Sequence, residues 1–153
     1  MLIALYARAL EAQCPAPLVQ DDKAAALVRQ IDYDFSRFKL NGHDQATTIM
    51  RLREFDRRAQ DFLARHPEAV VVHIGCGLDT RFERVDNGQV EWYDLDLPEV
   101  IELRHQLLDE TARCRFLGCS VFDRTWLDLV SIHASRSFLF LAEGVFHTLQ
   151  KCR

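Results

Sequence analysis

The spacing of hydrophobic residues changes once along this chain of 153 residues, near Pro67. Before Pro67, apolar residues recur at the period of an amphipathic helix, and prolines and acidic residues mark the ends of the periodic segments. The pattern predicts helices over residues 2–12, from Asp21 or Asp22 to about Ile31, and over residues 45–65, with a loop at residues 41–44. Residues 1–66 are therefore expected to form a helical cap.

After Pro67, short apolar runs alternate with helical or turn segments. Such alternation predicts βαβ units with right-handed crossovers and a parallel sheet. The run Val70–Ile74 has no polar alternation, which is typical of a strand buried on both faces. The expected strands cover residues 69–74, 90–94, 113–119 and 137–141, and the connecting segments cover residues 78–85, 98–112 and 123–134.

The predicted fold class is therefore α/β, with a Rossmann-like parallel sheet of about four strands over residues 67–153, behind the helical cap. We expect a single domain over residues 1–153, with the fourth strand beside the first. The sequence ends about ten residues after that strand, so the domain is expected to be incomplete. Phe138–Leu141 would then form an exposed apolar sheet edge, which predicts self-association.

Composition narrows the function classes. Lysine and arginine number 19 against 23 aspartate and glutamate, for a net charge of −4, and no segment concentrates positive charge, so no nucleic-acid partner is expected. Five cysteines without CxxC spacing predict neither a disulfide framework nor a metal site. Arg8 and Glu11 interrupt the apolar start too early for a signal peptide or a membrane span, so a cytoplasmic protein without membrane contact is expected.

The strongest chemical signal is the turn at Gly75 and Gly77, directly after the first buried run. Glycine pairs also occur in ordinary turns, but here acidic residues follow a second strand about 20 positions downstream, where they could bind ribose hydroxyls. Thr80 stands where dinucleotide sites have a third glycine, and the charge of Asp79 would oppose a pyrophosphate. Asp79 suits a cationic ligand group instead, and S-adenosylmethionine carries an ammonium, a sulfonium and no phosphate. An NAD-dependent oxidoreductase is the disfavoured alternative.

Three segments carry a resemblance to a known family: VVHIGCGLDTRF, WYDLDLPEVIELR and FLAEGVFHTL. Together they are similar to the leucine carboxyl methyltransferase family, in particular its bacterial branch of polyketide-type O-methyltransferases related to tetracenomycin synthesis. The resemblance implies a class I methyltransferase fold, S-adenosylmethionine as the methyl donor, and a small molecule or carboxylate as the acceptor.

The resemblance also implies cofactor-binding residues. Gly75 and Gly77 match the family's cofactor turn, and Asp96 matches its ribose-binding acid. Asp94 is the next candidate, with a solvated aspartate at a strand end as the alternative, and the second strand is expected to end between these two aspartates. The remaining implied residues are Arg51 for the methionyl carboxylate, with Arg53 competing for this role, Ser120 and Val121 beside the adenine, and Glu143 in the pocket wall.

No catalytic residue is assigned, because a sulfonium is already an activated leaving group and alignment is the main requirement. His73 is interpreted as a hydrogen-bonded core residue and His147 as a surface histidine. Two hypotheses follow: an S-adenosylmethionine-dependent O-methyltransferase, or a truncated, catalytically silent remnant that binds the cofactor or associates through its sheet edge.

Overall fold

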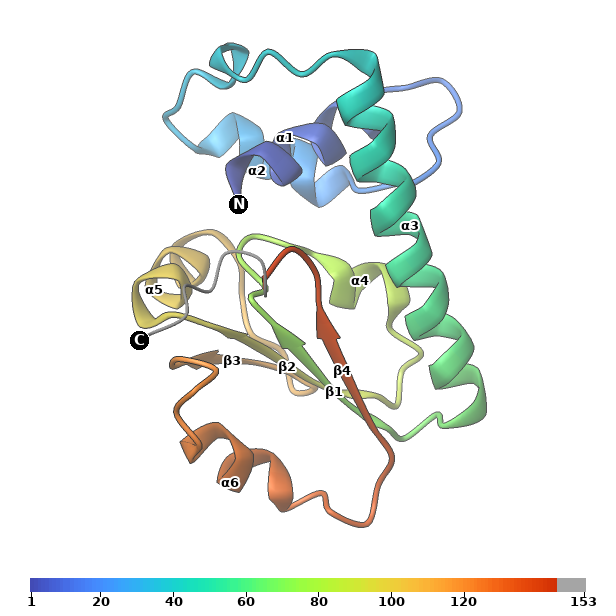
Figure 1. Ribbon diagram of the computed structural model, residues 1–153, viewed down its shortest axis with the longest axis vertical. Coiled ribbons are helices and arrows are strands. Elements are labelled where there is room, and N and C mark those ends of the chain that lie inside the picture. The colour runs from blue at the N-terminus through green and yellow to red at the C-terminus, as the bar shows by residue number, and fades with distance from the viewer. Residues whose placement is uncertain (146–153) are drawn as a thin grey trace, which may run out of the picture. The chain divides into compact units, whose positions relative to one another are not determined.

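A computed structural model describes residues 1–145 of the chain (Figure 1). It divides into two compact units. The first unit contains Met1–Gln60 and Leu78–Val85, and the second contains Asp61–Gly77 and the described residues from Asp86 to Val145. The elements are, in chain order, α1 (Leu2–Glu11), α2 (Asp22–Gln30), the 3₁₀ helix η1 (Phe35–Arg37), α3 (Gly42–Arg65), β1 (Val70–Ile74), α4 (Arg81–Val85), β2 (Glu91–Asp96), α5 (Pro98–Leu107), β3 (Cys114–Gly118), α6 (Thr125–Ser131) and β4 (Phe138–Ala142).

The four strands form one parallel sheet in the order β3-β2-β1-β4. This confirms the predicted α/β fold, the four strands and the place of the fourth strand beside the first. All five residues of β1 are buried, as the apolar run predicts, because β1 has a strand on each side and its two faces are covered. The register pairs Val70 with both Glu91 and Phe138, and His73 with Asp94.

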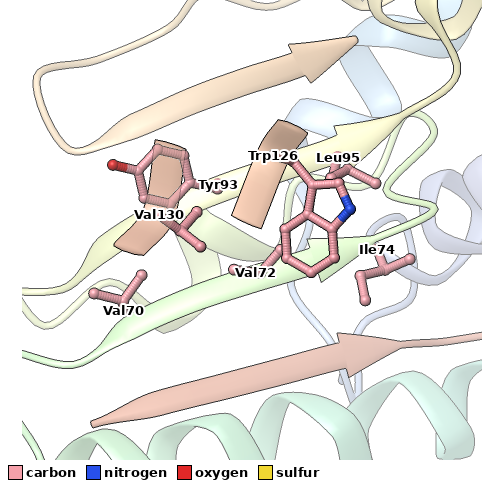
Figure 2. Close-up of a cluster of buried hydrophobic side chains, with 7 residues drawn as sticks. All are labelled: Val70, Val72, Ile74, Tyr93, Leu95, Trp126 and Val130. Atoms are coloured by element: carbon pink, nitrogen blue, oxygen red, sulfur yellow. The ribbon is translucent and has the colours of Figure 1, made fainter. Parts of the chain in front are cut away.

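Helices α5 and α6 cover opposite faces of this sheet (Figure 1). On the α6 face, Trp126 and Val130 pack against apolar side chains of β1 and β2 (Figure 2). Because side chains alternate along a strand, the other face carries a polar group of buried residues. That group includes His73 of β1 and Trp92 and Asp94 of β2, and Arg104 of α5 reaches it.

In the first unit, α1 and α3 share a small apolar core. Asp21 caps α2 by accepting a 2.9 Å hydrogen bond from the amide of Ala24, which settles the choice between Asp21 and Asp22. Helix α3 begins at Gly42, so the loop predicted at residues 41–44 is wrong for all but its first residue. Asn41 accepts a 2.9 Å hydrogen bond from the amide of Asp44, and this contact starts the helix three residues earlier than the apolar pattern suggests.

The second strand is longer than predicted, and the expectation that it ends between Asp94 and Asp96 is wrong. Asp96 still pairs with Gly118 of β3, and its carbonyl accepts a 2.9 Å hydrogen bond from the amide of Cys119. The two aspartates therefore lie on the same face of the sheet.

Strand β4 lies at one edge of the sheet among the described residues. Within residues 1–145, β4 has only β1 as a sheet neighbour, and Phe140 on β4 is 52% exposed. The expectation that all of Phe138–Leu141 is exposed is wrong, because Leu141 is buried and Phe138 and Leu139 are half-buried. No helix in this described part is both long enough and apolar enough to cross a membrane.

Candidate functional site

The carboxyl ends of the four parallel strands lie at one edge of the sheet, which is where open α/β sheets bind ligands. In the second unit, this edge brings together most of the residues implied by the family resemblance. They are Gly75 and Gly77 after β1, Asp96 at the end of β2, Ser120 and Val121 after β3, and Glu143 after β4.

The turn after β1 bends back onto β2. Gly75 and Gly77 have φ angles of 68° and 51°, a region that favours glycine. The amide of Gly75 donates to the Leu95 carbonyl at 2.7 Å, and the Cys76 amide approaches the same carbonyl at 3.3 Å. The amide of Gly77 donates to Oδ2 of Asp96 at 2.7 Å. All three amides of the turn are therefore bonded to β2.

The turn also leaves no room for a side chain at Gly75. A Cβ atom built there would lie 2.3 Å from Cγ2 of Val145, which follows β4. The segment that follows β4 thus packs against the start of the turn, and glycine is required at position 75 for space as well as for φ.

Asp96 is half-buried and holds two amides, those of Gly77 and, at 2.8 Å, of its own neighbour Leu97. One bond goes to each carboxylate oxygen. An ionised carboxylate offers about four lone-pair positions, so acceptor capacity remains on both oxygens. Asp96 can therefore accept bonds from ligand hydroxyl groups while it holds the turn.

Asp94 is fully buried, 1% exposed, so the alternative of a solvated aspartate is wrong. Its Oδ1 accepts a 2.9 Å hydrogen bond from Nε1 of Trp92 and lies 3.1 Å from Nδ1 of His73. Its Oδ2 pairs with the Arg104 guanidinium and accepts the Cys114 thiol at 3.6 Å. Burial alone would raise the pKa of Asp94, but Arg104 and then His73 outweigh it and lower that pKa. The contact with Asp94 confirms His73 as a hydrogen-bonded core residue.

Arg104 is a residue of this site that the sequence analysis did not find. It is 3% exposed on α5, lies with its guanidinium 4.5 Å from the centre of the Phe116 ring, and donates from Nη1 to the Gly77 carbonyl at 2.9 Å. The available signal was its position three residues after Ile101, on the buried side of α5. A charged residue on a buried helix face needs a partner, and Arg104 finds it in Asp94, which is itself buried on β2.

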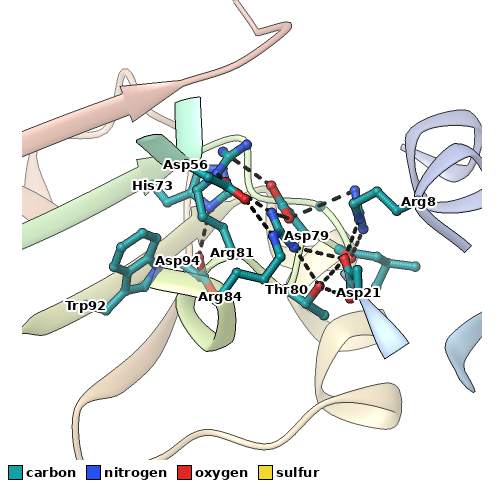
Figure 3. A network of polar contacts seen from close by, with 12 residues as sticks. Arg8, Asp21, Asp56, His73, Asp79, Thr80, Arg81, Arg84, Trp92 and Asp94 are labelled. Carbon is teal, nitrogen blue, oxygen red and sulfur yellow. Dashed lines mark hydrogen bonds and ion pairs between the residues drawn. The ribbon is translucent and has the colours of Figure 1, made fainter. Parts of the chain in front are cut away.

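In the first unit, Asp79 belongs to a network of buried ion pairs (Figure 3). Its carboxylate lies 3.0 Å from Arg84 Nη2 and 3.2 Å from Arg81 Nη1. Burial would lower the pKa of Arg84, but Asp79 and the other aspartates raise it above its usual value. The network contains three arginines and three aspartates, which are Arg8, Arg81, Arg84, Asp21, Asp56 and Asp79. The Thr80 hydroxyl joins it by donating to Asp21.

The predicted contact between Asp79 and a cationic part of the cofactor stays a prediction. The network explains why Asp79, Thr80 and Arg81 stand together in the sequence without reference to a ligand. Arg8 adds a 2.7 Å bond from Nη2 to the Leu78 carbonyl, so the segment after the turn is fixed within the first unit.

The remaining predicted residues of the described chain are exposed or half-buried. Arg51 is exposed on α3 in the first unit, as is its competitor Arg53, which lines a cavity of about 600 Å³. Ser120 accepts the amide of Phe122 at 3.3 Å, and the Val121 carbonyl accepts Trp126 Nε1 at 3.2 Å. Glu143 is half-buried, and His147 lies outside the described residues.

Within residues 1–145, no cluster of histidine, cysteine and acidic side chains is arranged to hold a metal ion.

A Rossmann-like sheet with a glycine turn and an acidic residue on neighbouring strand ends defines the class of nucleoside-binding α/β proteins. Within that class, the leucine carboxyl methyltransferase family model matches residues 1–150, and the chain belongs to this family.

Two relatives extend this comparison. The tetracenomycin polyketide synthesis O-methyltransferase TcmP of Streptomyces glaucescens is 45% identical over 146 residues, covering 95% of this chain and 53% of TcmP. The S-adenosyl-L-methionine-dependent methyltransferase dpfgK of Gibberella zeae is 34% identical over 160 residues, with the same two shares. The chain thus spans about half the length of the curated relatives it matches.

Proposed function

We propose that this chain binds S-adenosylmethionine at the carboxyl ends of its strands and serves the transfer of the methyl group to an oxygen of an acceptor, either a carboxylate or a hydroxyl. The proposal is supported by membership of the methyltransferase family and by the names of the two relatives. The main structural support is the 2.7 Å hydrogen bond that the Gly77 amide donates to Asp96. This bond holds the Asp96 carboxylate beside the glycine turn, and the carboxylate still has acceptor positions for a ligand.

The donors and acceptors at the strand ends fit this cofactor. A pyrophosphate would require free backbone amides, and the three amides of the turn are already bonded to β2. The charged side chains Asp96 and Glu143 are acceptors, which suit hydroxyl and ammonium groups. S-adenosylmethionine offers both groups and no phosphate, so this arrangement favours it over NAD.

Each strand end then has a proposed task in holding the cofactor. Asp96 accepts the ribose hydroxyls, while Gly75 and Gly77 let the ligand approach the backbone closely. Ser120 and Val121 lie beside the adenine, and Glu143 forms part of the pocket wall.

For three other residues the proposal is narrower. Arg51 is proposed for the methionyl carboxylate on the family resemblance alone, as an exposed guanidinium of the kind that binds carboxylates in pairs of bonds. Asp94 accepts from four neighbouring side chains and Asp79 is paired with arginines of its own unit, so we assign both to fixing the protein rather than to direct contact with the ligand.

The reaction asks the protein mainly for alignment. The cofactor supplies a methyl group on a positively charged sulfur, which is already activated for transfer. The residues of the strand ends hold the nucleoside so that the methyl group and the acceptor oxygen can lie in line. A carboxylate acceptor has no proton to lose, so no general base is required for it.

Calorimetric titration of the purified chain with S-adenosylhomocysteine, and separately with NADH, tests the binding half of this proposal. We expect saturable binding of S-adenosylhomocysteine and none of NADH. Binding of NADH alone, or of neither ligand, would contradict the proposed cofactor.

A transfer assay with radiolabelled S-adenosylmethionine tests the second half. Small organic acids, phenolic polyketides and peptides are offered in parallel, since these classes present the two kinds of oxygen acceptor. Label is expected in one class, as a base-labile ester for a carboxylate or as a stable ether for a phenol. Cofactor binding with no transfer to any of them would favour a protein that binds the cofactor without turnover.

A further inference from the structure

The backbone of Gly77 is held on both of its sides within the second unit. Its amide donates to Oδ2 of Asp96 at 2.7 Å, and its carbonyl accepts Nη1 of Arg104 at 2.9 Å. Glycine has the least restricted backbone of all residues, so without these two contacts the peptide planes around Gly77 would rotate readily. The two side chains therefore supply the rigidity that the residue itself lacks.

Arg104 can act as a fixed point because it is itself immobilised. Its second terminal nitrogen pairs with Asp94, and its guanidinium lies over the ring of Phe116. Asp94 is in turn held by Trp92 and His73 on the neighbouring positions of β1 and β2. This chain of buried contacts connects the middle of the sheet to the turn at its edge.

We propose that Arg104 is a positioning residue of the cofactor turn: anchored on Asp94, it fixes the Gly77 carbonyl so that the Gly77 amide stays on Asp96 and the free lone pairs of Asp96 meet the ribose hydroxyls. This inference rests on the proposed function, because it assigns the effect of Arg104 to cofactor affinity. We assign Arg104 no direct contact with the ligand.

The geometry requires an arginine. A planar guanidinium spans Asp94 and the Gly77 carbonyl at once with two nitrogens in a fixed fork, whereas a lysine ammonium is a single point of charge. Arg104→Lys keeps the positive charge beside Asp94 and gives up the bond to Gly77. It therefore separates the positioning of the turn from the neutralisation of the buried carboxylate.

The first test reads the turn directly and needs no ligand. Gly77 is the one glycine in the sequence that follows a cysteine, so labelling cysteine with ¹³C at the carbonyl and glycine with ¹⁵N isolates its amide signal in an NMR spectrum of the full chain. In Arg104→Lys we expect this signal to move more than those of the other five glycines. A folded Arg104→Lys chain with an unmoved Gly77 signal would overturn the proposal.

Arg113→Lys is the matched control, because Arg113 pairs with Asp86 on the surface of the same unit. It should leave the Gly77 signal in place. If Arg104→Lys does not fold, hydrogen exchange in the wild-type chain tests whether the Gly77 amide stays on Asp96, as the proposal requires. We expect the Gly77 amide to exchange more slowly than the Gly88 amide, which bonds to the exposed Asp86 side chain. Equal or faster exchange of the Gly77 amide would contradict the proposal that the turn is held in place.

The second test measures the dissociation constant of S-adenosylhomocysteine by calorimetry. Losing a charge-assisted bond that orders the turn should weaken binding about tenfold in Arg104→Lys and leave Arg113→Lys unchanged. Equal affinity of wild type and Arg104→Lys would overturn the positioning role while leaving the proposed function intact. A wild-type chain that binds no S-adenosylhomocysteine would instead remove the proposed function, and this inference with it.

Discussion

The amide of Gly77 lies 2.7 Å from Oδ2 of Asp96, a residue on the neighbouring strand. The same carboxylate accepts the amide of Leu97, which begins the connection into α5. One side chain thus joins the turn after β1 to the end of β2. This contact explains why the glycine turn and the acidic strand end occur together in the sequence.

Asp96→Ala should weaken the binding of S-adenosylhomocysteine by about tenfold or more, because both the proposed ribose acceptor and the partner of the Gly77 amide are lost. Calorimetry measures the change in the dissociation constant. Glu99→Gln is the control, since Glu99 is an exposed acid nearby on α5. Equal losses in the two variants would indicate a general effect of charge rather than a contact.

Substituting three glycines by alanine should separate steric conflict from backbone strain. Gly42 lies in the first turn of α3 with open space around it, and Gly88 has a φ of 81° in open space. Gly75 combines a φ of 68° with the Cβ position 2.3 Å from Val145. We expect Gly42→Ala to be neutral or slightly stabilising, Gly88→Ala to cost about 1 kcal/mol, and Gly75→Ala to cost about 1–3 kcal/mol more.

Denaturant unfolding of the three variants gives these free energies. The order is the decisive result, since each value depends on how far the surroundings relax. A Gly75→Ala chain as stable as Gly88→Ala would show that Val145 does not close over the turn.

Asp94→Asn should lower the free energy of unfolding at pH 7 by about 3–5 kcal/mol, because it leaves the buried charge of Arg104 without its partner. The wild-type pKa of Asp94 lies below its usual value, so its contribution is present above about pH 4 and is lost as the pH falls through the lowered pKa. The difference between wild type and variant should therefore shrink in acid.

Urea unfolding at pH 7 and across the acid range measures this difference. Asp86→Asn serves as the control, since Asp86 pairs with Arg113 at the surface and should contribute only about 0–1 kcal/mol. A difference for Asp94→Asn that stayed constant into acid would argue against an ionised Asp94.

Asp79→Asn distinguishes the two roles considered for Asp79. If Asp79 serves the ion-pair network, the variant should unfold at a lower temperature, and the folded protein should keep its affinity for S-adenosylhomocysteine within about twofold. Calorimetry below the unfolding temperature provides the measurement. A loss of affinity with an unchanged unfolding temperature would support a direct contact with the cofactor instead.

Phe140→Lys tests self-association through β4. An exposed aromatic residue on a strand that has one sheet neighbour among residues 1–145 favours pairing with another chain, and a lysine there discourages it. Light scattering after size exclusion should show a lower mean mass for the variant than for wild type at the same concentration. A monomeric wild-type chain would contradict this partner prediction.

The sheet could be predicted because its strands are short, apolar and separated by helices. Val70–Ile74 identified β1, and the order of strands followed from general rules for such sheets. The end of β2 could not be found in the same way. Its last residue is polar, and only the pairing of Asp96 with Gly118 on another strand extends it.

Within the site, the glycines and the pair Asp94 and Asp96 were accessible from local spacing, because the turn and the strand end have fixed positions in this type of fold. Only the family resemblance favoured Asp96 over Asp94. Arg104 was not, since its importance lies in reaching Asp94 and Gly77 from a different element. A single charged letter in a helix does not reveal whether it faces water or a buried partner. The same limit applies to Asp79, whose partners are spread over the sequence.

The pairing of β1 with β4 has a consequence for the order of folding. Val70 meets Glu91 after a short excursion of the chain but meets Phe138 only after β2, β3 and three helices have intervened. Closing the longer loop costs more chain entropy, so β4 should dock late and detach first in local unfolding. Glu143 follows directly on β4, so its side of the site would be completed last during folding, and a ligand bound there would favour the docked strand.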